Sequence, residues 1–170
     1  AMDAYFGTVY PHERQCSEAV ELPGGTPTEK AEFRDNLIAD IAKVEQGMKI
    51  ALIGVVNPLI AAIRKRGGTC LPCDLQMERT HWGDPVEKDM EKVLDSADGV
   101  ICTGMTLSNG TFDRVIERVL ERSIPLTVYA QTGSAVAARF VGAGITSLVA
   151  EPFPFSQFSA NATRVFCYRG

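Results

Sequence analysis

No stretch of this sequence is apolar over the roughly 18 residues that a membrane helix requires, and its first residues lack the pattern of a signal peptide. A concentration of positive charge is also missing, since the net charge is -4 and Arg64-Lys65-Arg66 is the only run among otherwise scattered basic residues. Proteins that bind nucleic acid by general electrostatic attraction present a positive face, which this composition disfavours. We therefore expect a cytoplasmic protein that binds neither membranes nor nucleic acid.

The glycine-rich loops that bind nucleotide phosphates are missing as well. No P-loop motif occurs, and GVVNP (54–58) follows the first predicted strand where a dinucleotide-binding protein has GxGxxG. NAD or ATP bound in the usual manner would lack its phosphate site. S-adenosylmethionine has no phosphates, so an enzyme that uses it stays open, with Asp74 as a partner for ribose hydroxyls. A solvated strand end explains Asp74 equally well.

The five cysteines form no recognisable site. An odd number cannot pair completely, and a chain of 170 residues can bury a core without disulfides, so we expect reduced thiols. Cys70 and Cys73 form a CxxC motif within a predicted strand, where alternation sends the two side chains to opposite faces. No second pair is spaced for zinc, and no Ser-His-Asp or Cys-His arrangement is visible. Whether the protein is an enzyme is left open.

What the sequence does contain is a regular alternation of apolar strands and amphipathic helices. Strands are predicted at 48–56, 67–75, 98–104, 124–131 and 145–150, with a last one at 163–169 at the sheet edge. Helices are predicted at 28–47, 58–66, 84–97, 111–123 and 134–144, the first capped by Thr28 and the third by Asp84. This order predicts a doubly wound, mostly parallel Rossmann-like α/β sheet of five to six strands with helices on both faces.

The beginning of the chain has a different texture. Residues 1–27 are rich in proline and glycine, and we expect an irregular segment with His12 at the surface. Residues 28–170 are predicted to form a single Rossmann-like domain.

Polar residues follow the predicted strands where each strand ends. Thr103–Thr111 (TGMTLSNGT) is densely polar, and QTGS (131–134) follows the next strand. In open α/β sheets ligands bind beyond the carboxyl ends of the strands, so these residues should converge at one edge. Hydroxyls, an amide and free N–H groups favour an anionic or oxygen-rich ligand. The candidates at the strand ends are Asn57, Asp74, Thr103, Gly104, Thr106, Asn109, Thr111, Gln131, Thr132 and Ser134.

The same loop also has a purely structural explanation. Asn109-Gly110 can form a turn, and Thr111 can cap the following helix. Since a cap requires one such residue rather than five, ligand binding is the favoured interpretation.

The segment MERTHWGDP (77–85) carries the histidine that lies nearest to a strand end. Glu78 and His81 could supply a carboxylate and an imidazole to a divalent transition metal, and His81 could alternatively act as a general base. A loop histidine that stacks on Trp82 is the other interpretation, and it is slightly favoured.

Three segments resemble a known family: GVVNPLI (54–60), ADGVICTGMTLSNGT (97–111) and GAGITSLVA (142–150). Over about residues 48–150 the chain is similar to the Rossmann-like domain of the DUF364 family, which is described as a heavy-metal chelation domain. The resemblance implies that the family's matching positions are occupied by Asn57-Pro58, Asp74 or Glu78, Asp84, Thr103, Gly104, Thr106, Asn109 and Thr111. QTGSAV (131–136) departs from the Pro-Ser-Thr-Pro that is typical after the fourth strand.

Family members also carry an enolase-N-terminal-like domain ahead of this one, with the site between the two domains. Fewer than 50 residues precede the first predicted strand here, too few for that domain. The resemblance therefore implies either a partner chain that supplies the missing N-terminal domain or a different use of the same polar loop.

Three functions remain in competition. The first is a small-ligand or metal-chelate binding domain, in transition-metal or chelator metabolism, that uses the polar loop after the third strand. The second is an enzyme that uses S-adenosylmethionine or a nucleotide. The third is a non-catalytic, dimeric regulatory or assembly domain, in which the polar loop is only a helix cap and a turn. Separately, the phenylalanines of AEPFPFSQF (150–158) are expected to cover the sheet edge or to form a homodimer contact.

Overall fold

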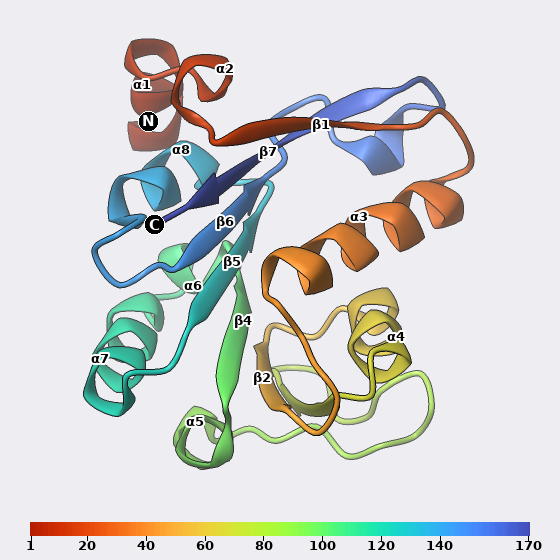
Figure 1. Cartoon of the computed structure of the whole chain (residues 1–170), viewed down its shortest axis with the longest axis vertical. Helices are drawn as coiled ribbons and strands as arrows, with labels where there is room; N and C mark the ends of the chain where they lie inside the picture. Colours follow the sequence, from red (N-terminus) through yellow and green to blue (C-terminus); the bar gives the residue numbers. More distant parts are fainter.

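The computed structural model describes all 170 residues and contains one seven-stranded sheet (Figure 1). The strand order is β1-β7-β6-β5-β4-β2-β3. The strands are β1 Glu18–Leu22, β2 Lys49–Ile53, β3 Thr69–Cys73, β4 Gly99–Thr103, β5 Leu126–Ala130, β6 Ser147–Ala150 and β7 Thr163–Arg169. The five strands β3, β2, β4, β5 and β6 are parallel, whereas β7 runs antiparallel to both β6 and β1. The predicted mostly parallel α/β class is confirmed, with seven strands instead of five to six.

Helices cover both faces of the sheet. Helices α3 and α4 lie on one face, and α5, α7 and α8 lie on the other (Figure 1). Their bounds are α1 Met2–Val9, α2 His12–Gln15, α3 Pro27–Ile41, α4 Asn57–Lys65, α5 Met90–Ser96, α6 Met105–Ser108, α7 Phe112–Arg122 and α8 Ser134–Ala137, with 3-10 turns η1 Ala138–Phe140 and η2 Ser156–Phe158. Along β2 the side chains alternate, so that Ile50 and Leu52 join the core beneath α3 and α4, and Ala51 and Ile53 join the opposite core. Burial on both faces explains the continuous apolar run of this strand.

The strand order reverses at β2. From β2 the chain first adds β3 on one side and then returns to add β4, β5 and β6 on the other. Such a reversal leaves a crevice between β2 and β4 at the carboxyl ends of the strands, where the crossover helices diverge to opposite faces. The reversal lies next to Gly54 and Thr103, at the place where other open α/β sheets bind their ligands.

The first 27 residues are not irregular, which corrects the expectation from sequence. They form α1, α2 and strand β1, which pairs with β7. Consequently β7 lies inside the sheet and β1 takes the edge position that was predicted for residues 163–169. In β1 only Leu22 is buried, so the strand carries too weak an apolar pattern to be recognised from sequence. His12 is also buried rather than at the surface.

Two predicted helix starts are wrong. Helix α3 begins at Pro27, and Thr26 rather than Thr28 forms the capping box with Glu29; the helix then ends at Ile41, before Gly47. Helix α5 begins at Met90 with Asp89 as its cap. Asp84 does not adjoin this helix, because residues 85–89 are not helical, and its carboxylate instead pairs with Arg64 at 2.6 Å and accepts from Thr80 at 2.9 Å. In α3 the capping box places the helix start earlier than predicted, and in α5 a cap nearer the apolar residues places it later.

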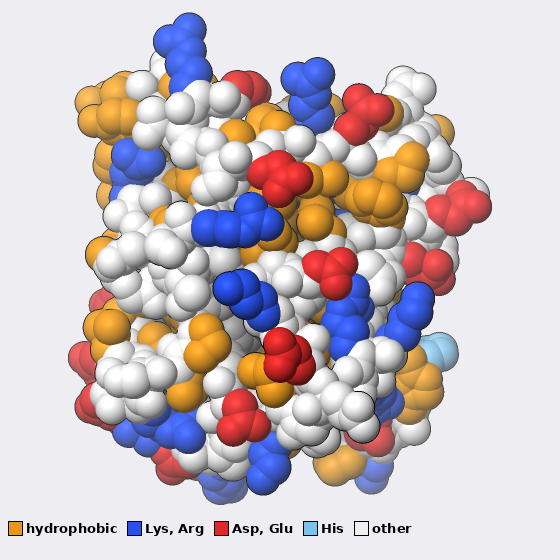
Figure 2. All heavy atoms as spheres, in the orientation of Figure 1, with side chains coloured by type: hydrophobic (Ala, Val, Ile, Leu, Met, Phe, Trp, Pro, Cys, Tyr) orange, Lys and Arg blue, Asp and Glu red, His pale blue; other side chains and the backbone are white.

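The outer surface mixes charges of both signs. On the face shown in Figure 2, acidic and basic side chains are interspersed and no large area carries one sign. None of the helices is both long and apolar enough to cross a lipid bilayer.

Candidate functional site

A cleft of about 640 Å³ lies at the carboxyl ends of β2, β3, β4 and β5, where the strand order reverses. Eight of the residues selected from sequence line it, namely Asp74, Thr103, Gly104, Thr106, Asn109, Thr111, Gln131 and Thr132. The apolar part of the wall comes chiefly from Ile53, Val55, Val56, Met90, Met105 and Tyr129. The volume falls within the roughly 300–1,000 Å³ that is usual for small-molecule sites.

Two glycines allow the loops around the cleft to approach each other. A β-carbon on Gly54, which has φ +85°, would lie 2.5 Å from the Thr103 hydroxyl oxygen. On Gly104 a β-carbon would lie 2.5 Å from the Thr132 carbonyl oxygen. Any larger residue would push these loops apart, so both glycines are required for the shape of the cleft.

The polar loop after β4 satisfies much of its own hydrogen bonding. It contains the short helix α6, which was not predicted. The Thr106 hydroxyl donates to the Thr103 carbonyl at 2.8 Å, and the Asn109 side-chain oxygen accepts from both the backbone N–H and the hydroxyl of Thr111, at 3.1 and 2.7 Å. Thr106 and this oxygen therefore serve the loop itself, whereas Thr111, which precedes α7, makes no side-chain cap hydrogen bond, so the predicted cap is wrong. The Thr103 and Thr132 hydroxyls and the Asn109 side-chain nitrogen have no protein partner.

Asp74 joins the ends of β2 and β3. One carboxylate oxygen accepts from the Val55 N–H at 3.1 Å, and the other accepts from the N–H groups of Gln76 and Met77 at 2.8 and 3.0 Å. Burial acts to raise the pKa of Asp74, but the three backbone donors outweigh it and the pKa is lowered. Asp74 is thus an ionised residue whose main contacts organise the loops.

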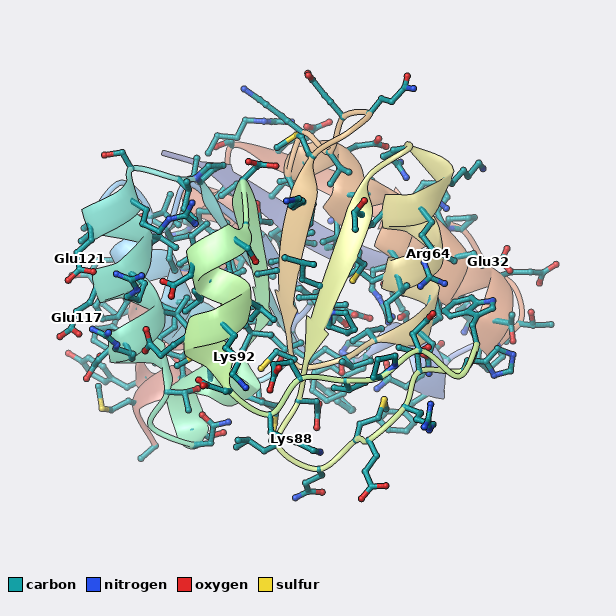
Figure 3. All side chains as sticks on the ribbon, turned by 90° about the horizontal axis from the view of Figure 1, so that it is seen from below. Glu32, Arg64, Lys88, Lys92, Glu117 and Glu121 are labelled. Atoms are coloured by element: carbon teal, nitrogen blue, oxygen red, sulfur yellow. The ribbon has the colours of Figure 1, made fainter.

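Charge within the cleft wall is balanced. Lys88 is the one basic residue there and Asp74 is the one acidic residue. In Figure 3 Lys88 lies beside the ends of β2 and β3, on the loop that leads to α5. Its ammonium group donates to the Met77 carbonyl at 2.7 Å and has two further N–H donors.

A buried ionic network lies behind the cleft wall. The carboxylate of Glu151, which is fully buried, accepts from the Tyr129 hydroxyl at 2.6 Å, from the Gln131 amide at 3.0 Å and from the Ser156 N–H at 2.5 Å. Arg34 lies 3.6 Å from the same carboxylate, with its guanidinium 5.0 Å from the centre of the Tyr129 ring. Burial favours a higher pKa for Glu151, but these donors and Arg34 lower it below its ordinary value.

Glu151, Arg34 and Tyr129 were not predicted from the sequence as functional residues. Glu151 directly follows the apolar strand β6, and an acidic residue at such a strand end was the available signal. Arg34 and Asp35 lie on α3, with 2.8 Å between the Arg34 Nε and the Asp35 Oδ1. The sequence of this helix contains no recognisable functional motif.

Three of the predicted ligand residues lie outside the cleft wall. Asn57 starts α4, and its side-chain oxygen accepts from the His81 N–H at 2.9 Å. Asp84 pairs with Arg64. Ser134 is buried, and its hydroxyl lies 3.1 Å from a ring nitrogen of His12. Each of these polar groups is engaged with the protein itself.

The residues predicted for a metal do not assemble into a site. Glu78 and His81 are both exposed, and the His81 ring meets Trp82 edge-on with 5.6 Å between ring centres. Cys70 and Cys73 belong to opposite cores, as alternation along β3 predicts. No group of three or more His, Cys, Asp or Glu side chains is arranged to hold a metal ion. The chain's own donors therefore do not fit a bare heavy-metal ion.

Comparison with known sequences points to one family. The sequence pattern of DUF364, described as "Putative heavy-metal chelation", matches residues 36–147, about two thirds of the chain. The matched segment contains β2 to β5 and hence the loops of the cleft. No curated protein matches the chain.

Comparison with solved structures supports the fold. A protein of unknown function from the DUF364 family of Pyrococcus horikoshii is 16% identical, with a TM-score of 0.57 over 85% of this chain and 66% of that one. The α-aminoadipate aminotransferase LysN of Thermus thermophilus is 12% identical, with a TM-score of 0.60 over 98% of this chain and 45% of that one. A mitochondrial aspartate aminotransferase of Trypanosoma brucei is 15% identical, with a TM-score of 0.53 over 100% and 49%. The chain thus spans less than half the length of these aminotransferases, and the likeness concerns the α/β fold alone.

Proposed function

The chain belongs to the DUF364 family, and from this premise we propose that its cleft binds a metal in the form of a small organic chelate. The family description concerns heavy metals, whereas the donors of this chain do not fit a bare ion. An organic chelator resolves this difference because it supplies the metal ligands itself. The protein then has to recognise only the chelator.

The observation that carries the proposal is the set of polar groups left free in the cleft. The hydroxyls of Thr103 and Thr132 and the side-chain nitrogen of Asn109 lack protein partners and line one cavity. Hydroxyl and amide groups hydrogen-bond to the oxygens of organic ligands. The spare N–H donors of Lys88 suit a chelator carboxylate.

The apolar wall supports the same ligand class. Val55, Val56, Met90 and Met105 offer carbon and sulfur surface that a bare, hydrated cation does not use. A ligand with a carbon skeleton of moderate size contacts this wall while its carboxylates reach the polar groups.

A thermal-unfolding screen tests the proposal. Nickel(II) alone, nitrilotriacetate alone, nickel nitrilotriacetate, iron(III) citrate and S-adenosylmethionine serve as probes. A chelate present at 100 times its dissociation constant should add about 2.7 kcal/mol to the unfolding free energy. We expect stabilisation by a loaded chelate and little effect of the bare metal.

The variants should alter the cleft without altering its shape. Thr132→Val removes a free hydroxyl, and Asn109→Asp keeps the oxygen that Thr111 uses while it removes the free side-chain nitrogen. Ser108→Ala is the matched control, since this hydroxyl bonds to the Met105 carbonyl in the same loop and does not line the cleft. The double variant should lose the chelate effect and the control should keep it.

Two results would contradict the proposal. Bare metal that stabilises the double variant as much as the original protein would indicate a site elsewhere. Stabilisation by S-adenosylmethionine alone would assign the cleft to adenosine-containing ligands. Two further predictions are independent of the ligand: the protein forms a homodimer, or it associates with a partner that supplies a preceding domain. The molar mass measured by light scattering tests the first alone and, in the presence of a partner, the second.

A further inference from the structure

The loop that follows β5 has two sides with different roles. On one side Gln131 and Thr132 line the cleft. On the other side the backbone of residues 133–136 faces α1, which packs against α8 (Figure 1). A group that holds the second side therefore also determines where the first side lies.

Asp3 is the group that holds it. Its carboxylate accepts from the backbone N–H groups of Gly133 at 3.0 Å, Ala135 at 2.8 Å and Val136 at 3.3 Å. Hydrogen bonds to an ionised acceptor are roughly twice as strong as neutral ones, and three of them converge here. Gly133 has φ +73°, a conformation that glycine adopts readily and other residues rarely do.

The remaining contacts of α1 are few. None of its residues is buried, and Met2 and Tyr5 are each 64% exposed. Beyond α1, the Arg139 guanidinium lies 4.6 Å from the centre of the Tyr10 ring, and His12 bonds to Ser134 at 3.1 Å. Asp3 is consequently the principal polar anchor between α1 and the cleft loop.

This anchor lies outside the part of the chain that matches the family. The matched segment begins at residue 36, whereas Asp3 lies in α1. The loop that receives it, QTGSAV (131–136), lies inside the matched segment. The contact therefore joins a segment outside the match to the shared cleft.

We propose that Asp3 is a positioning residue for the cleft and that α1 controls ligand binding through it. By fixing the backbone of residues 133–136, Asp3 holds the Thr132 hydroxyl at the cleft wall and its carbonyl against Gly104. The effect on affinity rests on the proposed function, whereas the effect on the loop does not.

Amide hydrogen exchange followed by NMR tests the effect on the loop. In Asp3→Ala the amides of Gly133 and Ala135 should exchange about tenfold faster or more, because each loses a charge-assisted hydrogen bond. The Thr132 and Gly104 amide resonances should shift as the cleft wall moves. Asp113→Ala removes an exposed acidic residue from the first turn of α7 and should leave all four amides unchanged.

Rescue by a small carboxylate separates this role from general loss of folding. Excess formate should restore the exchange rates of Asp3→Ala by filling the vacated position, and chloride at the same ionic strength should not. Unchanged exchange in Asp3→Ala, or rescue by chloride as well, would overturn the proposal.

Titration with nickel nitrilotriacetate and iron(III) citrate completes the test. If the original protein binds either probe, Asp3→Ala should bind it at least about tenfold more weakly, and formate should recover the affinity. Equal affinity in Asp3→Ala would overturn the role in binding. If the original protein binds neither probe, the proposed function fails, and the exchange data alone decide the role of Asp3 in the loop.

Discussion

Gly104 and Thr132 meet so closely that a β-carbon on Gly104 would lie 2.5 Å from the Thr132 carbonyl oxygen and 3.0 Å from the Ala130 β-carbon. The loops after β4 and β5 thus touch through backbone atoms, on two neighbouring parallel strands. Gly104 has an ordinary helical backbone conformation, with φ -59°, so its small size rather than a special torsion angle is what the position requires.

Replacing Gly104 by alanine should therefore separate the two loops. Overpacking of this kind typically costs about 1–3 kcal/mol, and we expect that loss in urea unfolding. Gly7→Ala is the control, since its β-carbon would make an ordinary 3.8 Å contact with Ala135 and alanine favours the helix. A Gly104→Ala variant as stable as the original protein would show that the loops can shift freely.

Glu151 should be the most costly acidic residue to remove. Glu151→Ala leaves the Tyr129 hydroxyl and the Gln131 amide without their acceptor and deprives Arg34 of a nearby negative charge. Breaking a buried charge pair costs about 3–5 kcal/mol, which chemical denaturation measures. Glu121→Ala, which removes an exposed ion pair with Arg118, should cost less than about 1 kcal/mol. Equal losses would contradict the structural role of Glu151.

His12 should make stability decrease in mild acid. Burial lowers the pKa of His12 below its ordinary value of 6.5, and its ring nitrogens bond to Tyr168 and Ser134. Below pH 6.5 the unfolded chain takes up a proton on this residue that the folded protein resists. The unfolding free energy therefore falls from pH 6.5 down to the folded pKa and is fully retained above pH 6.5.

Unfolding measurements at several pH values check this dependence on His12. His12→Gln should be less stable at neutral pH and should lose part of the decrease in acid. His81→Gln, which changes an exposed histidine, should retain the full decrease. A His12→Gln variant with an unaltered pH profile would assign the acid sensitivity to other groups.

The CxxC pair should be unreactive in the folded protein. Burial raises the pKa of Cys70 to about 12 and that of Cys73 to about 11, the latter with help from Glu87 and Asp74. Because the thiolate is the reactive form, iodoacetamide at neutral pH should label neither residue until the protein is unfolded. Mass spectrometry of native and urea-unfolded samples gives the comparison. Rapid labelling of the native protein, or a disulfide between the two, would contradict this expectation.

The central strands and the cleft position could be predicted from sequence because their signals are local. Strands β2, β4, β5 and β6 are continuous apolar runs, since both of their faces are buried, and helices of suitable period separate them. In a parallel sheet the polar residues that leave these strands must converge at one edge, and eight of the selected residues do line the cleft.

The partners of those polar groups could not be predicted, because they come from distant parts of the chain. The Glu151 carboxylate contacts Tyr129, Gln131 and Arg34, and no pattern in the neighbouring sequence predicts these contacts. Likewise the Thr106 hydroxyl donates to the Thr103 carbonyl within its own loop. This hydrogen bond depends on the backbone geometry of the loop and not on the residue type alone.

Periodicity and strand direction were thus enough to predict the α/β class, the parallel core and the edge of the sheet at which the cleft lies. Which polar groups of the cleft lack a protein partner, and how the first residues join the sheet, depend instead on contacts between distant parts of the folded chain. Asp3 and Gly133 are 130 residues apart, and a hydrogen bond across that separation leaves no periodic trace in the sequence. The contact exists because the folded sheet places α1 beside the loop that follows β5.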